Sequence, residues 1–380
     1  MKIKLIYLSF PLSLIFACTP INKPKMDESA SSSEENRSFY DSSIFGNWNN
    51  NKELVNKIKR RLSTLNLPSA VVGVVSRDVK GLIFTGESSP RKKPDENTIY
   101  PIGSITKVFT GLLSSQAIIE NKIHLNTRVS DITTPNLAPL LEERTVAQLL
   151  SHYAGYRSMP ANLNFNSIAP AKDYSFNDLL LCLKYHESCA SNRSEPGDRY
   201  TYSNLGSGLL YLSLSHLYNV SPINALDPIL KAFNLSSTRW VRELSNDIGL
   251  DLAIAYDRQG NVIPYNTMGV LMGAGELTTS GLDLLKLMEA FVFPFRKNER
   301  TALIVRELKR PIKGHIAFSI DIKDLDGDRI FKKDGATPGS STVIVWNEDE
   351  NIGAFVMTNI GGKNKEITNN LLKPLVSNGL

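Results

Sequence analysis

The hydrophobic pattern changes along this 380-residue chain and separates its two ends from its middle. Short runs of β-branched and aromatic residues predict strands at 70–76, 82–86, 316–323, 329–333, 342–346 and 352–358. Apolar residues at helical spacing predict helices over 52–65, 107–120, 146–151, 176–183, 205–217, 222–232, 279–291 and 363–376. This order predicts an α/β fold of the α+β type, in which both chain ends build one antiparallel sheet flanked by helices. A large helical region, residues 107–300, is inserted into it.

The first eighteen residues predict export rather than a folded element. Lys2 and Lys4 precede an apolar run from Leu5 to Ala17, which has the length of a signal-peptide core and is too short to span a bilayer. The run ends in Ile15-Phe16-Ala17-Cys18, which resembles a bacterial lipobox. We therefore expect residues 1–17 to be removed and Cys18 to receive a lipid. The alternative is an ordinary secretory signal that is cut near Ala17.

The segment that follows differs in composition from the rest of the chain. Residues 18–51 are rich in Ser, Glu and Asn and hold few aliphatic side chains, which predicts a flexible tether after the lipidated cysteine. The globular body is expected from residue 52 to residue 380. A lipid anchor and a tether predict a protein of the bacterial cell envelope, held to a membrane on its periplasmic or extracytoplasmic face.

Composition and charge exclude several classes of protein. The chain is 42% hydrophobic with a formal charge of +5, which falls to +3 once Lys2 and Lys4 are removed, and no basic block is interleaved with aromatics. This balance argues against a nucleic-acid partner. Three cysteines exclude a disulfide-rich scaffold and a cysteine-built zinc site, and the five histidines lack metal-ligand spacing. Asp324, Asp326 and Asp328 invite a calcium interpretation, but Gly327 is misplaced for that loop and favours a turn.

A serine and a lysine near the start of a predicted helix are the first candidates for chemistry. The chain has no Gly-x-Ser-x-Gly, no His-Glu-x-x-His and no glycine-rich nucleotide loop. Ser104 lies near a helix N-terminus, where free amides favour an oxyanion, and Lys107 shares its face three residues later. A buried lysine can activate a serine by losing its proton or by pairing with a base that does. Taken alone, such a pair is far more often a helix cap and a solvated lysine.

Two further motifs give this pair a context. Tyr202-x-Asn204 precedes another predicted helix, and Lys333-Asp334-Gly335 ends a predicted strand. The order Ser-x-x-Lys, Tyr-x-Asn and Lys-x-Gly resembles the penicillin-recognising serine hydrolases, and most of all their class C β-lactamase and D,D-peptidase group. Residues 149–155, 195–197 and 273–280 agree with the same group, and the resemblance covers residues 53–376. It implies a β-lactamase/transpeptidase-like fold.

The resemblance also implies roles for these residues. Ser104 would be the acylated nucleophile, and Tyr202 would be the general base, with a phenol pKa lowered by the ammonium groups of Lys107 and Lys333. Asn204 would orient Lys107 and the substrate amide. The backbone N–H groups of Ser104 and Ala336 would form the oxyanion hole, and Gly335 would let the substrate lie flat on the strand. The family needs no metal or organic cofactor.

Asp334 departs from the pattern of the family, in which a hydroxyl residue usually helps to hold a substrate carboxylate. An aspartate facing the cleft would repel that carboxylate, unless Lys333 offsets it or the side chain turns away. Asp334 therefore argues against an efficient β-lactamase and favours an esterase, an amidase or an amine-recognising peptidase. We expect a serine hydrolase of the D,D-peptidase, D-aminopeptidase or esterase type, with a small-molecule, peptidoglycan-peptide or ester substrate. The alternatives are a true class C-like β-lactamase and, from another class, a non-catalytic cell-envelope binding lipoprotein.

Cys182 and Cys189 remain once Cys18 is assigned to the lipid. They lie seven residues apart, and in an oxidising compartment an even pair favours a disulfide. Two free thiols are the alternative.

Overall fold

The computed structural model describes residues 42–163, 174–185, 189–190, 195–246, 249–296, 298–325 and 327–376. The predicted signal peptide, Cys18 and most of the predicted tether lie outside these residues. Within them, no helix combines the length and the apolar character needed to cross a bilayer.

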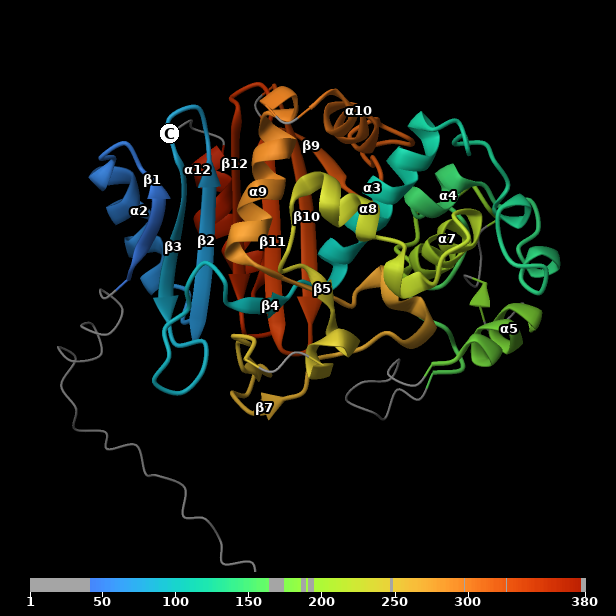
Figure 1. Cartoon of the computed structure of the whole chain (residues 1–380), viewed down its shortest axis with the longest axis horizontal. Helices are drawn as coiled ribbons and strands as arrows, with labels where there is room; N and C mark the ends of the chain where they lie inside the picture. The colour runs from blue at the N-terminus through green and yellow to red at the C-terminus, as the bar shows by residue number, and fades with distance from the viewer. Residues whose placement is uncertain are drawn as a thin grey trace, which may run out of the picture. The chain divides into compact units, whose positions relative to one another are not determined.

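A seven-stranded antiparallel sheet forms one half of the described body (Figure 1). Its spatial order is β1-β3-β2-β12-β11-β10-β9. The strands are β1 (Ile44–Asn47), β2 (Ser69–Val75), β3 (Lys80–Gly86), β9 (Asp321–Leu325), β10 (Asp328–Thr337), β11 (Ser340–Asn347) and β12 (Ile352–Thr358). The pairing of β2 with β12 joins the two ends of the chain, as the hydrophobic pattern predicts.

Helices cover both faces of this sheet, which explains why β2, β11 and β12 are buried along their whole length. Helix α9 (Gly281–Val292) crosses the front face in Figure 1 and contacts β2, β3 and β12. The other face carries α2 (Lys52–Ser63) and the C-terminal segment α11 (Asn364–Ile367), a π-helical turn and α12 (Lys373–Val376). Alternate residues supply two separate cores, since Val71 packs on the α9 side and Val72 on the α2 side.

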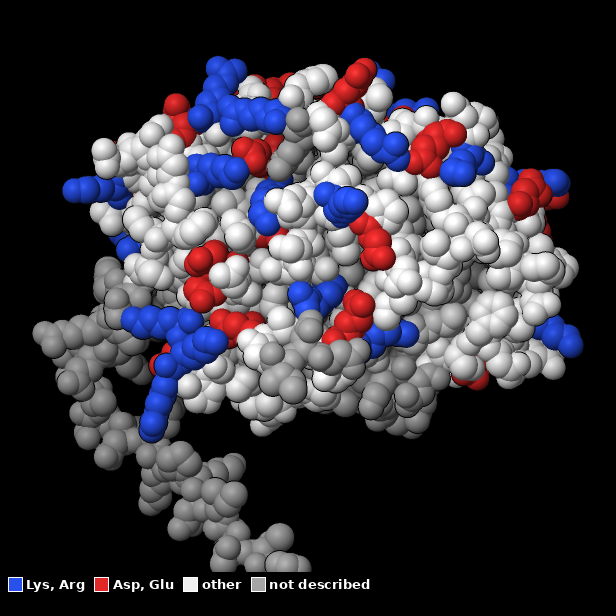
Figure 2. All heavy atoms as spheres, in the orientation of Figure 1, with Lys and Arg blue, Asp and Glu red and all other residues white. Residues whose placement is uncertain are grey.

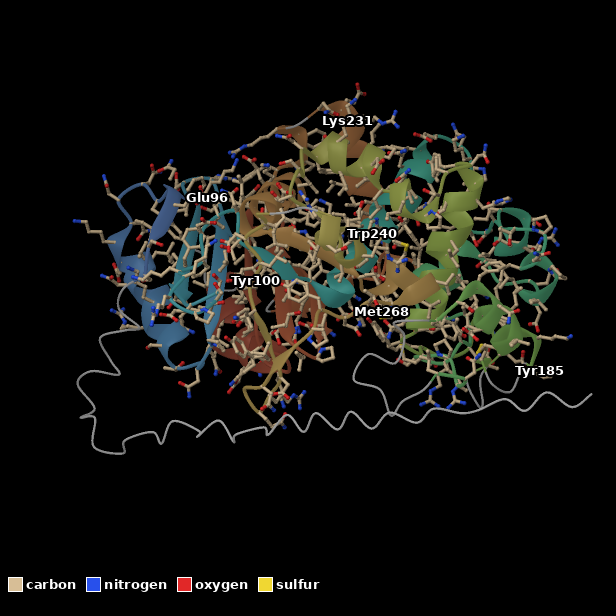
Figure 3. The ribbon with its side chains drawn as sticks, turned by 60° about the horizontal axis from the view of Figure 1, so that its bottom comes forward. Glu96, Tyr100, Tyr185, Lys231, Trp240 and Met268 are labelled. Atoms are coloured by element: carbon tan, nitrogen blue, oxygen red, sulfur yellow. A yellow bond between two sulfur atoms is a disulfide. The ribbon has the colours of Figure 1, made fainter. Side chains whose placement is uncertain are left out.

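The inserted region forms the other half of the body and is mainly helical. It contains α3 (Thr106–Ile119), α4 (Val146–Leu150), α5 (Phe176–Lys184), α7 (Asn204–Leu217), α8 (Asp227–Phe233) and α10 (Glu299–Leu308). Short strands β4 (Ile99–Pro101), β8 (Leu277–Ser280) and β5 (Arg239–Trp240) form a three-stranded sheet, and β6 (Ala255–Tyr256) pairs with β7 (Val262–Ile263). Tyr100 on β4 and Trp240 on β5, both labelled in Figure 3, are buried.

Helix α3 lies at the centre of the inserted region and is buried from Thr106 to Ala117. Neighbouring elements surround the helix, since α10, α7 and the segment Gly269–Ala274 all pack against it. The hydroxyls of its Thr and Ser residues donate to backbone carbonyls; Ser114, for example, donates to Thr110 O at 2.8 Å. The helix is therefore a rigid support for whatever precedes it.

The predicted fold is confirmed, with corrections to several of its elements. Strand β1 lies inside the segment predicted as tether, because its backbone pairs with β3 and the Trp48 side chain that follows it is buried. The Trp48 indole donates to Phe45 O at 3.0 Å. Helix α10 is absent from the prediction. The strand predicted at 316–323 begins only at Asp321, because residues 316–320 form turns.

The two cysteines of the body form a disulfide. Cys182 on α5 and Cys189 are bonded, with their Cα atoms 5.5 Å apart.

On the face of the molecule that Figure 2 shows, positively and negatively charged side chains lie interspersed.

Candidate active site

Ser104 lies in a single 3₁₀ turn, Gly103–Ile105, immediately before α3. Lys107 is one turn later on α3 and is 0% exposed. Its Nζ is 3.0 Å from Ser104 Oγ, 2.7 Å from Asn204 Oδ1 and 2.6 Å from the carbonyl oxygen of Ala274. The lysine is therefore no solvated surface side chain, and the alternative that the sequence left open is excluded.

Tyr202 and Asn204 enter the site from the start of α7, which is capped by Ser203 between them. The Tyr202 hydroxyl donates to Ser104 Oγ at 2.6 Å. Asn204 accepts from Lys107, as predicted, and its Nδ2 donates to Met159 Sδ at 3.1 Å. Because a thioether is a weak acceptor, that amide N–H is available to a better one.

Lys333 comes from the sheet side of the site. Its side chain extends from β10 and is 6% exposed, and its Nζ lies 5.2 Å from the centroid of the Tyr202 ring. Lys107 Nζ lies 4.9 Å from the same centroid. The structure thus brings together Ser104, Lys107, Tyr202, Asn204 and Lys333, which come from three separate parts of the chain.

The backbone of β10 approaches the turn at Ser104 closely. Gly103 has a left-handed φ of +48°, and a Cβ there would lie 2.7 Å from the backbone nitrogen of Ala336. A Cβ on Gly335 would lie 2.0 Å from the carbonyl oxygen of Ile102. Both positions therefore require glycine, and the two glycines bring the Ala336 amide next to the turn that carries Ser104.

Burial changes the protonation of both lysines, though unequally. It lowers the pKa of Lys107 well below its ordinary value, and the charge of Lys333 lowers it further. Burial also lowers the pKa of Lys333, but the carboxylates of Asp321 and Asp334 oppose this, and the value remains about 8. Lys107 is therefore the more readily neutral amine of the two.

The prediction that the Tyr202 pKa is lowered is wrong. Burial raises the pKa of this phenol, the hydrogen bond with Ser104 opposes the rise, and Tyr200, Asp321 and Asp334 add to it. The sequence argument assumed two ammonium groups beside the phenol, but burial disfavours the charge on Lys107. A tyrosinate is therefore not the resting form of Tyr202.

Asp334 lies outside this cluster. Its carboxylate accepts from Lys332 Nζ at 2.8 Å, and its side chain is 41% exposed. Alternate residues of a strand face opposite sides, so Asp334 and Lys332 point away from the face that carries Lys333. Strand β9 pairs with β10 only as far as Asp321 opposite Lys332. Beyond that pair, no described strand lies against the outer edge of β10 at residues 333–337, whereas β11 pairs with the inner edge.

A layer of hydrogen bonds behind the site holds Lys107 in place. The segment Gly269–Ala274 passes beneath α3, where Thr110 donates to Gly273 O at 2.8 Å next to the Lys107–Ala274 contact.

The same segment is tied at its other end by a buried carboxylate. Glu276 is 0% exposed, accepts from the backbone N–H of Met268 at 2.7 Å and pairs with Arg242 at 2.6 Å (Met268 is labelled in Figure 3). Residues 273–280, one of the stretches that agree with the class C β-lactamase and D,D-peptidase group, thus support the site from behind.

Two residues near the site are absent from the sequence prediction. The sequence assigns no role to His152, yet its ring lies 4.6 Å from the Tyr202 ring, centroid to centroid. The only signal for it was its place in the matching stretch 149–155. Asp321 influences both Tyr202 and Lys333 electrostatically. No local pattern could have indicated it, because the pairing of β9 with β10 brings it there.

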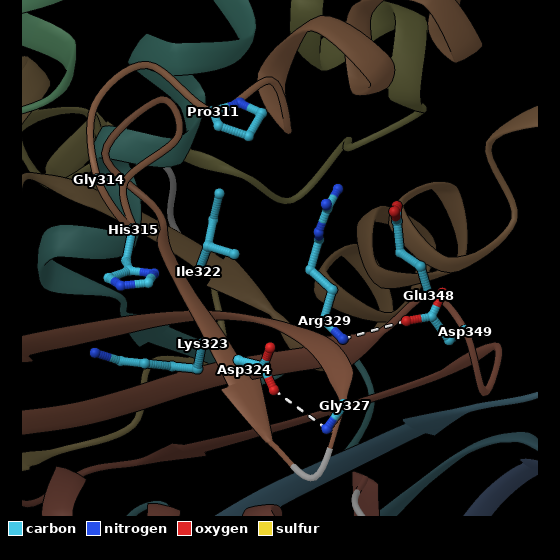
Figure 4. Close-up of a pocket in the computed structure, with 10 residues that line it drawn as sticks. All are labelled: Pro311, Gly314, His315, Ile322, Lys323, Asp324, Gly327, Arg329, Glu348 and Asp349. Atoms are coloured by element: carbon cyan, nitrogen blue, oxygen red, sulfur yellow. Dashed lines mark hydrogen bonds between the residues drawn. The ribbon is translucent and has the colours of Figure 1, made fainter.

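A cavity of about 520 Å³ lies elsewhere, between the β9–β10 hairpin and the β11–β12 turn (Figure 4). It contains none of the predicted site residues. Asp324 accepts from the Gly327 N–H and Asp349 accepts from the Arg329 N–H, both at 3.2 Å. These carboxylates therefore hydrogen-bond to the backbone of the turns. Asp326 lies outside the described residues, within which no group of three or more His, Cys, Asp and Glu has a metal-binding arrangement.

The fold and this cluster define the class of protein. The chain belongs to the beta-lactamase family, whose sequence model matches residues 54–373. Over 241 residues it is 24% identical to a beta-lactamase of Providencia stuartii, and the match covers 63% of this chain and 59% of the relative. It is 25% identical over 224 residues to "Protein flp" of Staphylococcus aureus strain N315, covering 56% of this chain and 43% of that protein. The chain thus spans about half the length of these relatives.

Solved structures share the fold. The class C beta-lactamase from Rhodobacter sphaeroides superposes with a TM-score of 0.69 at 19% identity, covering 83% of this chain and 96% of that one. The octameric penicillin-binding protein homologue from Pyrococcus abyssi superposes with a TM-score of 0.67 at 20% identity, covering 82% and 73%.

Proposed function

We propose that this protein is a serine hydrolase that cleaves amide or ester bonds through an acyl-enzyme on Ser104. One observation carries the proposal: Ser104 Oγ lies within hydrogen-bonding distance of both Lys107 Nζ and the Tyr202 hydroxyl. A serine is a weak nucleophile until a neighbouring base accepts its proton, and this site supplies a buried base at 3.0 Å. Membership of the beta-lactamase family supports the same reaction type.

Lys107 is the better candidate for the base. Two of its three oxygen neighbours, Asn204 Oδ1 and Ala274 O, can only accept hydrogen bonds. A neutral amine gives both of them an N–H and keeps its lone pair for the hydroxyl proton of Ser104. Burial lowers the pKa of Lys107 well below its ordinary value, which favours that neutral form.

The remaining groups then follow the reaction. As Ser104 Oγ attacks the substrate carbonyl carbon, its proton passes to Lys107, and the backbone N–H groups of Ser104 and Ala336 receive the developing oxyanion. Such donors contribute roughly 3–4 kcal/mol each in other enzymes. The Tyr202 hydroxyl, which lies beside Ser104 Oγ, gives its proton to the leaving group. The Lys107 ammonium then returns a proton to the Tyr202 oxygen, so that both groups regain their starting forms. Water then hydrolyses the acyl-enzyme by the reverse sequence of proton transfers.

Lys333 and Asn204 hold the substrate in this scheme. The Lys333 ammonium attracts a negatively polarised group of the substrate, and Asn204 Nδ2 exchanges Met159 for the substrate amide oxygen. The unpaired edge of β10 at residues 333–337 offers backbone groups to an extended substrate, such as a peptidoglycan peptide.

Acylation can be tested directly by intact-mass analysis. The soluble body is mixed with a penicillin and, separately, with a nitrophenyl ester, and each adduct is located by peptide mapping. We expect an adduct on Ser104 that is absent from Ser104→Ala and retained in Ser114→Ala, which changes a buried serine of α3. An adduct on another residue, or an equal adduct on Ser104→Ala, contradicts the proposal.

The two probes also separate two types of hydrolase. Because Asp334 adds a carboxylate near Lys333, we propose an ester, D,D-peptide or D-amino-acid peptide as substrate and place a class C-like β-lactamase second. Faster acylation by the penicillin would favour the β-lactamase. A non-catalytic binding lipoprotein is the third candidate, and the intact cluster around Ser104 argues against it.

We further propose that the protein is exported and anchored in the cell envelope by a lipid on Cys18. Lys2, Lys4 and the apolar run before Cys18 support this, and the Cys182–Cys189 disulfide suits an oxidising compartment. Mass analysis of the N-terminal peptide from membranes tests it. A peptide that begins at Cys18 with acyl chains is expected, and an unprocessed N-terminus contradicts the proposal.

A further inference from the structure

We propose that His152 is a positioning residue, which holds the backbone on both sides of Tyr202 and thereby places the Tyr202 hydroxyl on Ser104. This inference rests on the proposed function, in which that hydroxyl takes part in acyl transfer. His152 follows α4 and is 2% exposed, so its contacts are made within the protein.

Two hydrogen bonds from His152 enclose Tyr202. The backbone N–H of Thr201 donates to the carbonyl oxygen of His152 at 2.8 Å. The backbone N–H of Ser203 donates to the imidazole Nδ1 at 3.3 Å. The residue before Tyr202 and the residue after it are thus held by the same histidine.

The imidazole also contacts the Tyr202 side chain. Its ring centroid lies 4.6 Å from that of Tyr202, and the two planes are tilted by 48°. Tyr202 is therefore bounded by the imidazole as well as by Lys107 and Lys333. The phenol is left with little freedom to leave its 2.6 Å contact with Ser104 Oγ.

The backbone of His152 is itself unusual. It has a φ of +64°, a left-handed conformation that few residues other than Gly and Asn adopt without strain. Such conformations persist where the surroundings enforce them, often beside reacting groups.

The ring must be neutral to act in this way, because Nδ1 accepts the Ser203 N–H. Burial, with the charges of Lys333 and Lys107, lowers the pKa of His152 well below its ordinary value. The proton of the neutral ring then lies on Nε2, which is buried and has no partner among the described residues. Among the described residues, the hydrogen bond from Ser203 N–H to Nδ1 is therefore the polar contact that the ring makes.

Two substitutions separate the acceptor from the rest of the ring. In His152→Asn an amide oxygen can take the place of Nδ1, and asparagine tolerates the left-handed backbone. His152→Leu still fills the buried space with a side chain but has no acceptor for the Ser203 N–H. The readouts are the rate constant for acylation of Ser104 by a nitrophenyl ester, its dependence on ester concentration and the thermal unfolding midpoint.

We expect His152→Leu to lower the maximal acylation rate by about tenfold or more, since a small misplacement of a reacting group has effects of this size. The ester concentration that gives half of the maximal acylation rate should stay nearly unchanged. His152→Asn should recover most of the rate. Equal losses in both variants would overturn the proposal.

A double-mutant cycle with Tyr202→Phe tests whether His152 acts through the phenol. If it does, His152→Leu costs almost nothing further once the hydroxyl is gone, whereas a merely structural role gives additive losses. Additive losses overturn this inference alone. Full acylation by Tyr202→Phe itself overturns the role of Tyr202 in the proposed function. If His152→Leu does not fold, His152→Gln, whose polar atoms lie one bond further out, takes its place with the same expectation.

Discussion

The helical side and the sheet side of the site each contribute one buried lysine to Tyr202. Lys107 on α3 and Lys333 on β10 lie at similar distances from the Tyr202 ring, 4.9 Å and 5.2 Å. Their electrostatic surroundings differ. Lys107 meets only uncharged oxygens, whereas Lys333 has the carboxylates of Asp321 and Asp334 nearby, which counteract the effect of burial on its pKa.

This difference assigns the two lysines different tasks. A buried amine without a counter-charge loses its proton readily and can serve as a base. A buried amine with nearby carboxylates keeps its proton to higher pH and can serve as a fixed cation. The neighbours of each lysine, and not burial alone, therefore distinguish the base from the binding group.

Removing each lysine should give the largest and the most distinct effects. Lys107→Met should lower the acylation rate constant by about 10²–10⁴-fold, the usual contribution of a general base. Lys333→Met should chiefly raise the ester concentration needed for half-saturation. Steady-state kinetics and intact-mass analysis measure both. If the acylation rate constant falls by the same factor in both variants and the ester concentration for half-saturation is unchanged in both, the two lysines do not have separate tasks.

Placing a carboxylate beside Lys107 should make it resemble Lys333. Asn204→Asp puts an acid 2.7 Å from Lys107 Nζ, and an opposite charge at that distance raises a lysine pKa by about 1–3 units. The acid limb of the pH–rate profile, where Lys107 gains its proton, should then move to higher pH. Asn204→Leu serves as the control, since it loses the amide without adding charge. An acid limb that stays in place would mean that Lys107 is not the titrating base.

The alkaline limb should report Lys333. Its ammonium is lost as the pH rises through about 8, so binding that depends on this charge should weaken above that value. In Lys333→Arg the charge persists, and the alkaline limb should shift upward by at least about one unit. The pH profile of kcat/KM for an anionic ester measures this, with a neutral ester as control. An unchanged alkaline limb in Lys333→Arg would assign it to another group.

The strands and most helices could be predicted because their signals are local. The apolar run of β2 and the helical spacing of α2 reflect neighbouring residues, and both elements form as expected. The prediction failed where the pattern is short or ambiguous. Thr279 and Ser280 read as the start of a helix, but they end β8, and α9 begins only at Gly281. Strand β1 has four residues, too few for a periodic signal.

The members of the site could be predicted from three spaced motifs, but their charges could not. Protonation depends on burial and on partners far away in the sequence. Asn204 is 97 residues from Lys107, and Asp321 approaches Lys333 only because β9 pairs with β10. The sequence argument therefore placed Tyr202 correctly beside Ser104 and assigned its pKa the wrong direction.

The smallest effect is expected at Asp334, the residue that departs from the family on the sheet side. Its carboxylate pairs with Lys332 and points away from the face of Lys333, so its repulsion of a substrate carboxylate is partly neutralised. We expect Asp334→Thr to raise the acylation rate by a penicillin, relative to a neutral ester, by about three- to tenfold, where tenfold corresponds to about 1.4 kcal/mol.

Two control variants separate charge from hydroxyl at this position. Asp334→Asn removes only the charge and should give part of the gain. Lys332→Met leaves Asp334 without its partner and should change the ratio in the opposite direction, since the carboxylate is then uncompensated. The ratio of the two acylation rates is measured for each variant by intact mass. If all three ratios equal that of the wild type, Asp334 does not influence the substrate. The asymmetry between the two lysines would then rest on Asp321 alone, and the ranking of ester and peptide substrates above β-lactams would lose its support.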